Sequence, residues 1–365
     1  MRVLVLDTIH GGRVLSDYLV RNGDSHLLVD VYRGPVLCAS DLETVKFDVV
    51  TAPVHLDPDY PLLHLGVPVV SHHEMSARLA EKYRIPCIEI TGAEGKTTTA
   101  FAVASLLSGS GILHTSAGTF LCPEMKLLFR RSITPASLLC VLDIAEKQGA
   151  EWIVCEESLG VSGIGELGIL TSLKDYRIAS GKKSALTAKL ESLQRCKKVL
   201  YPDRVNSLVS VDGIRITSPA GSFENPLVQL PVYRNALKTA AAAAFLLGLS
   251  VSPLGEFAAV PGRMHLYSEE GVTILDNANS GTNAENTASA SAYLRKVTGK
   301  PVVLVIGEES QMVCEGFSNM ESVIDDSFSS VIFAAGKSLP ELKKEGIVRA
   351  KEQNAALLLA VKMWR

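Results

Sequence analysis

The stretch IEITGAEGKTTTA, Ile88–Ala100, decides how the rest of the sequence is interpreted. Its apolar and β-branched start predicts a short buried strand, and the following residues, TTTAFAVASLLSG, predict a helix. The glycines between them allow backbone N–H groups to converge on an anion at the helix N-terminus, where Lys96 adds a positive charge and the Thr97 hydroxyl can bind Mg2+. A chance Gly-Lys pair at a threonine-rich helix start is the alternative. The sequence predicts a loop that holds the phosphates of ATP, with seven candidate residues: Gly92, Ala93, Glu94, Gly95, Lys96, Thr97 and Thr98.

Length and composition are typical of a water-soluble globular protein of two or three domains. The chain has 365 residues, 47% of them hydrophobic and 21% charged, so each domain can bury its own core. The net charge of −3 offers no positive surface for nucleic acid, and we expect no such partner. The seven cysteines include no C-x-x-C pair and indicate small core residues in a reducing cytosol, without zinc or an iron–sulfur cluster.

No segment predicts a membrane anchor or an export signal. The start, MRVLVLD, predicts a strand and lacks the basic leader and cleavage site of a signal peptide. The most apolar run, TAAAAAFLLGLSV (Thr239–Val251), is too short to span a bilayer and predicts a buried helix. We therefore expect a cytoplasmic protein.

Alternating strand and helix patterns divide the chain into three α/β units. Residues 1–86 predict a small parallel sheet of Rossmann type, but the HGG after its first strand lacks the full dinucleotide fingerprint, so NAD is not expected. Residues 87–260 contain the phosphate loop, the strands EWIVCEES and LGILTSL, a charged helix KKSALTAKLESLQRCKK and the alanine-rich helix. Residues 261–365 predict a third α/β unit with the strands VTILDN, PVVLVIG and SVIFAAG.

Two positions beyond the loop could carry chemistry. Glu156 and Glu157 end the strand WIVC, at the sheet edge where a carboxylate can hold the Mg2+ that bridges ATP phosphates; a merely solvated pair is the alternative. Lys189 falls within the apolar arc of its helix, where burial disfavours protonation of an amine. The alternative is a lysine whose amine extends past apolar neighbours to water.

These motifs together resemble those of the Mur ligase superfamily. TGAEGKTTT is similar to the family's TGxxGKTTT form, whereas a classical P-loop would need a glycine in place of Ile90. CEESL, the A-K pair at Lys189, PGRM and LDNANSG match further motifs in the same order, and RNALKTAAAAA stands in place of HNxxNxxAA. The matches extend from Ile88 to Gly281, about half of the chain. The resemblance implies a three-domain α/β fold: an N-terminal Rossmann-like domain, a central P-loop ATPase domain and a C-terminal Rossmann-like domain.

The resemblance also implies roles for single residues, with ATP and Mg2+ as cofactors. Thr97 and Glu156 would bind Mg2+, and Lys189, once carbamylated, would bind a second Mg2+. Asn235 would contact adenine and Asp276 the ribose. Arg263 would reach the γ-phosphate and stabilise charge during transfer. The implied catalytic residues are Lys96, Glu156, Lys189 and Arg263.

Two departures from the family pattern concern the second Mg2+. The histidine that follows the family's LTN strand is absent from LTSLKDYR, which leaves Asp175 as the nearest substitute. The histidine of the family's AHNP motif is Asn279 here. Both losses weaken the expectation of a second metal ion.

VLDTIHGG and LLLAVKMWR resemble a subfamily, the Mur-type enzymes of methane-metabolising archaea that complete coenzyme F(430), a nickel tetrapyrrole. The resemblance implies that ATP phosphorylates a carboxylate of the nickel seco precursor acid and that a carbon nucleophile of the same molecule displaces phosphate to close a ring. The N-terminal domain would hold this substrate. Alternatively, the two adjacent histidines cap a helix or face water, because SHHE resembles a capping box. The candidate contacts are His10, Gly11, Gly12, His72 and His73.

Two other functions remain open. One is an amide-forming Mur-like ligase that joins an amino acid or amine to a carboxylate. The other is a regulatory protein that binds ATP without catalysis. For either, as for the ring-closing enzyme, we expect a monomer or homodimer without a nucleic-acid or membrane partner.

Overall fold

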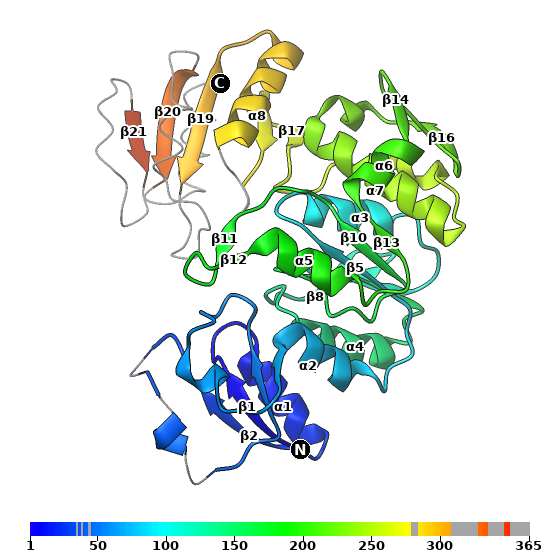
Figure 1. Cartoon of the computed structure of the whole chain (residues 1–365). Coiled ribbons are helices and arrows are strands. Elements are labelled where there is room, and N and C mark those ends of the chain that lie inside the picture. Colours follow the sequence, from blue (N-terminus) through cyan, green and yellow to red (C-terminus); the bar gives the residue numbers. More distant parts are fainter. Residues whose placement is uncertain are drawn as a thin grey trace. The chain divides into compact units, whose positions relative to one another are not determined.

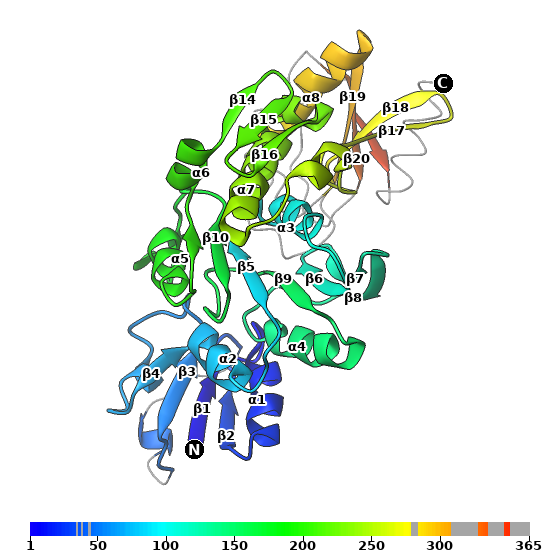
Figure 2. The same ribbon diagram turned by 90° about the vertical axis from the view of Figure 1, so that its right-hand side faces the viewer.

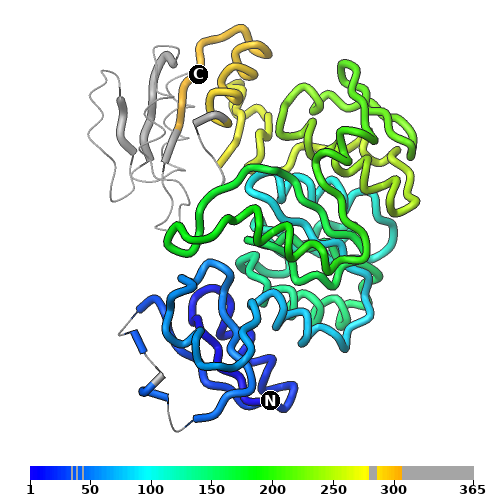
Figure 3. The backbone as a smooth tube through the Cα atoms, in the orientation of Figure 1, coloured from blue at the N-terminus to red at the C-terminus, as the bar shows by residue number. Residues whose placement is uncertain are grey.

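The computed structural model describes residues 1–33, 36–37, 39–42, 45–278, 284–307, 328–334 and 347–350 (Figure 3). The chain forms two compact units, Met1–Phe257 and Ala258–Arg365. Both combine helices with parallel strands (Figure 1), which confirms the predicted α/β class. None of the helices in the described ranges is both long and apolar enough to cross a bilayer.

A four-stranded parallel sheet forms the N-terminal part of the first unit, in the order β2-β1-β3-β4. Alternate residues of its strands face opposite sides. Val3 and Val5 pack in the core that includes helices α1 and α2, whereas Leu4 and Leu6 pack against apolar residues of the segments after β2 and β3. The elements are β1 Arg2–Leu6, α1 Gly12–Arg21, β2 Ser25–Val29, η1 Ala39–Leu42, β3 Val49–Ala52, η2 Pro61–Leu63, β4 Val69–Ser71 and α2 His72–Ala80.

A seven-stranded sheet forms the centre of the first unit, in the order β13-β10-β5-β9-β6-β7-β8. The strands from β13 to β6 run parallel, and β7 and β8 continue antiparallel. β5 therefore lies between β10 and β9, and the carboxyl ends of these strands meet at one edge of the sheet. The strands are β5 Cys87–Thr91, β6 Gly111–Thr115, β7 Gly118–Cys122, β8 Lys126–Phe129, β9 Trp152–Glu156, β10 Leu167–Leu170 and β13 Val199–Leu200.

Helices cover both faces of the central sheet. α3 packs against β5, β6, β9 and α7, and α4 packs against β6 and β9. The alanines of α7 are fully buried, so the predicted buried alanine-rich helix is confirmed. α4 also contacts α2 (Figure 2). One apolar core, which contains Leu19, Met75 and Leu142, therefore joins the two sheets. The helices are α3 Lys96–Ala104, α4 Ser137–Gln148, α5 Ala185–Leu193, α6 Pro202–Leu208, η3 Pro226–Gln229, α7 Pro231–Leu247 and η4 Ser252–Glu256.

Two small antiparallel sheets complete the first unit. β11 Arg177–Ile178 pairs with β12 Lys183–Ser184, and the other sheet contains β14 Ser210–Asp212, β15 Arg215–Ser218 and β16 Gly221–Glu224. The charged helix predicted over KKSALTAKLESLQRCKK is shorter than expected, because Ser184 caps it. Its hydroxyl accepts a hydrogen bond from Thr187 N at 3.0 Å, so Lys182 and Lys183 lie before α5.

The second unit begins with the hairpin β17 His265–Glu269 and β18 Val272–Asp276, followed by α8 Ala284–Thr298. A parallel sheet follows, in the order β19-β20-β21, with β19 Val302–Gly307, β20 Phe328–Ala334 and β21 Ile347–Ala350. The predicted division of the chain at residues 86 and 260 stays a prediction. The two sheets of the first unit lie on either side of residue 86.

Two fully buried carboxyl groups lie inside the central sheet of the first unit. Glu89 of β5 accepts hydrogen bonds from Gly163 N at 3.0 Å and Gly165 N at 2.7 Å. Glu157, just after β9, accepts from the amide and hydroxyl of Ser162 at 3.0 and 2.8 Å. Burial and then the neighbouring charge of Glu89 raise the pKa of Glu157 well above its usual value. The raised pKa favours the protonated form of Glu157 in the folded chain.

This protonation predicts how stability depends on pH. Because the folded pKa of Glu157 is raised, the folded chain keeps a proton that the unfolded chain loses, so stability falls as pH rises above the ordinary glutamate pKa. Glu157→Gln keeps one donor and one acceptor without a titrating proton. As pH rises, we expect the unfolding free energy of Glu157→Gln to increase relative to that of the wild type by up to about 1.4 kcal/mol per pH unit.

Denaturant unfolding of both proteins from mildly acidic to mildly alkaline pH measures this difference. Glu166→Gln is the matched control, since Glu166 is exposed and paired with Lys197. Parallel pH profiles for wild type and Glu157→Gln would show that Glu157 is ionised in the folded chain.

Candidate active site

The phosphate-loop sequence forms a tight turn between β5 and α3. Gly95 has φ 77°, and a Cβ at Gly92 would lie 2.1 Å from Thr171 Oγ1, so both positions require glycine. The Thr171 hydroxyl donates to the carbonyl oxygens of Thr91 and Glu94 at 3.2 and 2.5 Å and holds the turn to the end of β10. α3 begins at Lys96, and the first N–H groups of a helix have no acceptor within it. The exposed turn at this N-terminus is suited to bind an anion.

Glu156 connects three strand ends beside this turn. Its carboxylate is 2% exposed, and Oε2 accepts hydrogen bonds from Thr97 Oγ1 at 2.9 Å and Ser116 N at 3.0 Å. Oε1 lies 3.9 Å from Lys96 Nζ. Glu156 therefore contacts the loop residues, whereas Glu157 lies among the buried groups described above. A carboxylate and a hydroxyl beside a phosphate site suit Mg2+, which commonly binds one or two carboxylates together with the phosphates of its nucleotide.

Lys189 projects from α5 and is fully buried. Among the described residues its Nζ has no hydrogen-bond partner, and it lies 4.5 Å from the ring centre of Tyr176. Burial and then the positive charge of Lys96 lower the pKa of Lys189 to about 8, although the carboxylate of Asp175 raises it. The alternative, in which the Lys189 amine extends past apolar neighbours to water, is not observed, because the side chain is fully buried. A buried amine that is partly neutral near physiological pH can react with CO2 to form a carbamate.

The Asp175 carboxylate is held near the start of α5. It accepts hydrogen bonds from Ser184 Oγ and Leu186 N, both at 2.9 Å, and its negative charge acts on Lys189. Lys174, next to it, pairs with Glu94 of the phosphate loop at 2.9 Å. The segment after β10 thus connects the loop with the surroundings of Lys189.

The histidines predicted to contact substrate occupy different environments at the carboxyl edge of the N-terminal sheet. His10 is partly exposed, with 41% of its side chain accessible, and Gly11 forms the N-cap of α1 with φ 107°. His72 and His73 begin α2 and are 1% and 2% exposed, so neither faces water. The helix is capped instead by Ser71, which forms a capping box with Glu74.

Close packing fixes these positions. A Cβ at Gly12 would lie 1.8 Å from the carbonyl oxygen of Asp7, and one at Gly11 would lie 2.9 Å from Ala136 Cβ. His73 Nε2 lies 3.0 Å from the carbonyl oxygen of Ser158, and burial lowers its pKa to about 4. The predicted contacts of the three histidines and two glycines with a substrate stay predictions.

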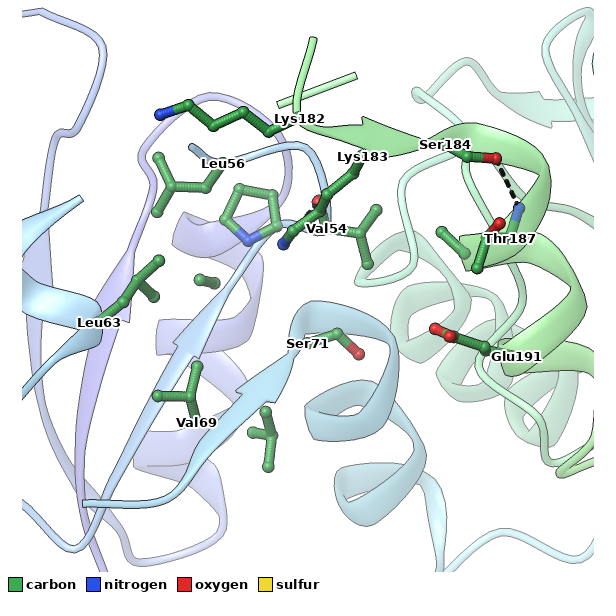
Figure 4. Close-up of a pocket in the computed structure, with 14 residues that line it drawn as sticks. Val54, Leu56, Leu63, Val69, Ser71, Lys182, Lys183, Ser184, Thr187 and Glu191 are labelled. Atoms are coloured by element: carbon green, nitrogen blue, oxygen red, sulfur yellow. Dashed lines mark hydrogen bonds between the residues drawn. The ribbon is translucent and has the colours of Figure 1, made fainter. Parts of the chain in front are cut away.

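A pocket of about 510 Å³ lies between the N-terminal sheet and α5 (Figure 4). Its apolar wall comes from the ends of β3 and β4 and the segment after β3. Its polar wall comes from β12 and the first turns of α5, and the Glu191 side chain extends towards Ser71. The lining residues are Ala52, Pro53, Val54, Leu56, Leu63, Val69, Val70, Ser71, Lys182, Lys183, Ser184, Thr187, Ala188 and Glu191.

The remaining candidates lie on α7 and in the second unit. Asn235 is exposed on α7, which packs against α3. Within the second unit, Asp276 accepts hydrogen bonds from Gly262 N at 3.0 Å and Ala278 N at 2.9 Å, so the PGRM and LDNA motifs are adjacent. Arg263 follows Gly262 in this turn. Asn279 lies outside the described residues. The nucleotide contacts of Asn235, Arg263 and Asp276 stay predictions.

Sequence reasoning missed several polar residues of these edges. Ser116 and Thr171 each follow a parallel strand of the central sheet by one residue, and Asp7, Tyr32 and His55 follow strands of the N-terminal sheet. The rule that ligands bind at carboxyl strand ends could have selected them. Within the described ranges, no group of three or more His, Cys, Asp or Glu side chains forms a ready metal site.

Comparison with known proteins identifies the family. The family model "Coenzyme F430 synthetase CfbE, C-terminal domain" matches residues 266–364. A protein named coenzyme F(430) synthetase from Methanosarcina acetivorans is 31% identical over 86% of this chain and 85% of its own length.

Solved structures of Mur ligases share the fold. MurF from Acinetobacter baumannii superposes with a TM-score of 0.56 at 12% identity, covering 96% of this chain and 92% of its own. MurF ligase from Thermotoga maritima, solved in complex with ADP, has a TM-score of 0.54 at 13% identity and covers 96% of this chain and 85% of its own. The predicted Mur ligase fold is therefore confirmed. Because the full-length relative is 31% identical over most of both sequences, the chain belongs to the coenzyme F(430) synthetase family.

Proposed function

We propose that this protein is an ATP-dependent ligase of coenzyme F(430) biosynthesis that closes the carbocyclic ring of the nickel seco precursor acid. Family membership supports the substrate, and the Mur ligase fold supports the use of ATP. The observation that carries the proposal is the contact of buried Glu156 with Thr97 and its approach to Lys96, at the turn between β5 and α3. A carboxylate, a hydroxyl and a lysine beside a glycine turn are suited to bind Mg2+ and the phosphates of a nucleoside triphosphate.

The chemistry proceeds through an activated carboxylate. A carboxylate oxygen of the substrate attacks the γ-phosphorus of ATP, ADP leaves, and an acyl phosphate forms. A carbon of the same molecule then loses a proton and attacks the acyl carbon, which forms a carbon–carbon bond and releases phosphate. The tetrapyrrole loses the elements of water overall, and its carboxylate becomes a ring ketone.

Residues of the first unit serve the first step. The turn at Gly92 and Gly95 and the N-terminus of α3 hold the phosphates, and Lys96 neutralises charge during transfer. Glu156 and Thr97 would hold Mg2+, which neutralises charge on the phosphate oxygens when bound. A carbamate on Lys189 would supply a carboxylate where the structure has an unpartnered buried amine, and so could hold a second Mg2+.

The pocket beside α5 fits part of an acidic macrocycle. Its volume of about 510 Å³ falls within the range of small-molecule sites, roughly 300–1,000 Å³. The apolar wall can pack against a ring system. Lys183, whose Nζ lies 3.4 Å from the Val54 carbonyl oxygen, can pair with a carboxylate. Lys182 is already paired with Asp57 and Asp59.

Two alternative functions can be distinguished from the ring-closing ligase. An amide-forming ligase would need an amine as the second substrate. A non-catalytic ATP-binding protein would have no use for a buried, unpartnered amine at Lys189 beside Lys96, and this observation favours an enzyme.

Turnover with one organic substrate tests the ring-closing reaction. The purified protein with ATP, Mg2+ and the nickel seco acid should release phosphate and yield a tetrapyrrole lighter by one water, as measured by mass spectrometry and visible absorption. Added amino acids should leave the rate unchanged. Phosphate release that depends on an added amine would support the amide-forming ligase instead.

Removing the loop lysine tests the phosphate site. Lys96→Ala should lower turnover by about 100- to 1,000-fold, because charge on the transferred phosphate loses its neutralising partner. Circular dichroism should show an unchanged fold. Lys197→Ala, which removes an exposed lysine paired with Glu166, is the control. Full activity in Lys96→Ala would refute the assignment of the loop.

Labelled carbon dioxide tests the carbamate on Lys189. The amine must be neutral to react, and its pKa is about 8, so a carbamate signal in 13C NMR should grow as pH is raised through that value. Lys189→Met should lose both the signal and turnover, whereas Lys197→Ala should keep them. A wild-type protein without the signal under saturating CO2 would show that Lys189 stays an unmodified amine.

A further inference from the structure

A cluster of five polar and aromatic residues at the carboxyl edge of the N-terminal sheet has no part in the phosphate chemistry. Three histidines from different parts of the sequence gather there around one carboxylate. The rings of His10 and His55 have centroids 4.5 Å apart, and His10 and Tyr32 are 5.0 Å apart. We call this group the imidazole cluster: Asp7, His10, Tyr32, His55 and His72.

Asp7 is the fixed centre of the imidazole cluster. Its side chain is fully buried and accepts hydrogen bonds from the backbone amides of Ile9 and His10, both at 2.6 Å. The oxygens of Asp7 lie 3.4 Å from His10 Nδ1 and 3.9 Å from His72 Nδ1.

His10 is the histidine of the imidazole cluster that a ligand can reach. His72 is 1% exposed, and burial lowers its pKa to about 3. His55 is half-buried, and its ring meets that of His10 edge to face at 86°. The ring of His10 meets both His55 and Tyr32 edge to face, its Nδ1 is buried 3.4 Å from Asp7, and 41% of its side chain is accessible. Nε2, on the opposite side of the ring, is the nitrogen left to bind a ligand.

We propose that His10, through Nε2, is the axial ligand of the nickel ion in the tetrapyrrole substrate, with Asp7 accepting the Nδ1 proton. This inference rests on the proposed function. A tetrapyrrole fills the four equatorial positions of its metal and leaves the axial positions to outside donors. One imidazole then suffices, which agrees with the absence of a multi-residue metal site in the described ranges. A carboxylate behind the second ring nitrogen is the usual arrangement of metal-binding histidines and sets the tautomer.

The surface around His10 suits the face of a macrocycle. Two large side chains beside the His10 ring are exposed, namely its chain neighbour Ile9 (39%) and Tyr32 (39%), whose ring it contacts. Such a group at a sheet edge favours contact with a flat, apolar ligand. Arg13 and Arg33 are also exposed close in sequence and can pair with substrate carboxylates.

A short chain of contacts links the His10 loop to the magnesium candidate. Gly11 packs against Thr134 and Ala136. The preceding carbonyl, of Ile133, accepts a hydrogen bond from Ser158 N at 2.9 Å, and Ser158 lies two residues after Glu156. Nickel ligation by His10 would thus anchor the macrocycle on the same unit as the phosphate loop, and intramolecular attack gains from such orientation.

Nickel X-ray absorption of the complex tests the proposal. The full-length protein is loaded with the nickel seco acid, and the wild-type spectrum should show one imidazole nitrogen on the metal. His10→Ala should lose this feature, and added imidazole should restore it by filling the vacated space. His10→Ala should also weaken tetrapyrrole binding by about 10- to 100-fold, with the KM for ATP changed by less than about twofold. Asp7→Asn should lengthen or weaken the nickel–imidazole bond.

His26→Gln is the matched control, since His26 lies on β2 at the amino end of the same sheet. Circular dichroism and ATP binding confirm that each variant folds, and His10→Gln serves if His10→Ala does not. A wild-type complex that turns over without an imidazole on nickel would overturn the inference and leave the proposed function standing. A protein that neither binds nor converts the tetrapyrrole would overturn both.

Discussion

The hydrogen bond between the Glu156 carboxylate and the Thr97 hydroxyl is the contact on which the geometry of the proposed active site depends. It connects the end of β9 to the first turn of α3, and the amide of Ser116 adds the end of β6. With Glu156 only 2% exposed, its charge is compensated by these donors and by Lys96 at 3.9 Å. The same carboxylate that satisfies these groups can take up Mg2+, so the contacts that hold three strand ends together also prepare the phosphate site.

Ionisable groups in the first unit are buried in two ways that differ in their consequences. Glu89 and Glu157 lie inside the sheet with backbone and serine donors, and one proton on Glu157 removes a like-charge repulsion. Lys189 Nζ has no hydrogen-bond partner among the described residues. It lies over the face of Tyr176, and the charges of Lys96 and Asp175 act on it. In the first arrangement three of the four carboxyl oxygens accept hydrogen bonds, and Glu157 Oε1 has no partner among the described residues. The second leaves a polar atom without compensation, which natural structures rarely tolerate outside functional sites.

Local motifs made the central sheet and its loop predictable, because strand, turn and helix follow one another in a single stretch of sequence. The glycine turn and the strand-end Glu156 each belong to a short local motif, whereas the contact of Gly92 with Thr171 depends on the pairing of β5 with β10. The length of α5 was missed because a single hydroxyl, Ser184, ends the preceding strand and caps the helix. The imidazole cluster was missed in part because His55 reaches His10 only through the order of β1 and β3, which no local pattern encodes.

A ring closure within one molecule imposes a constraint that an ordinary ligase does not face. Both reacting groups belong to one macrocycle, so there is no second organic substrate to position. The enzyme must instead fix the macrocycle relative to the ATP bound at the phosphate loop. The shared apolar core of α1, α2 and α4 meets this need, because it joins the N-terminal sheet to the central sheet inside one compact unit. Under the proposed function, a macrocycle bound at the imidazole cluster would be held on the same compact unit as Glu156, so its binding would also orient its carboxylate.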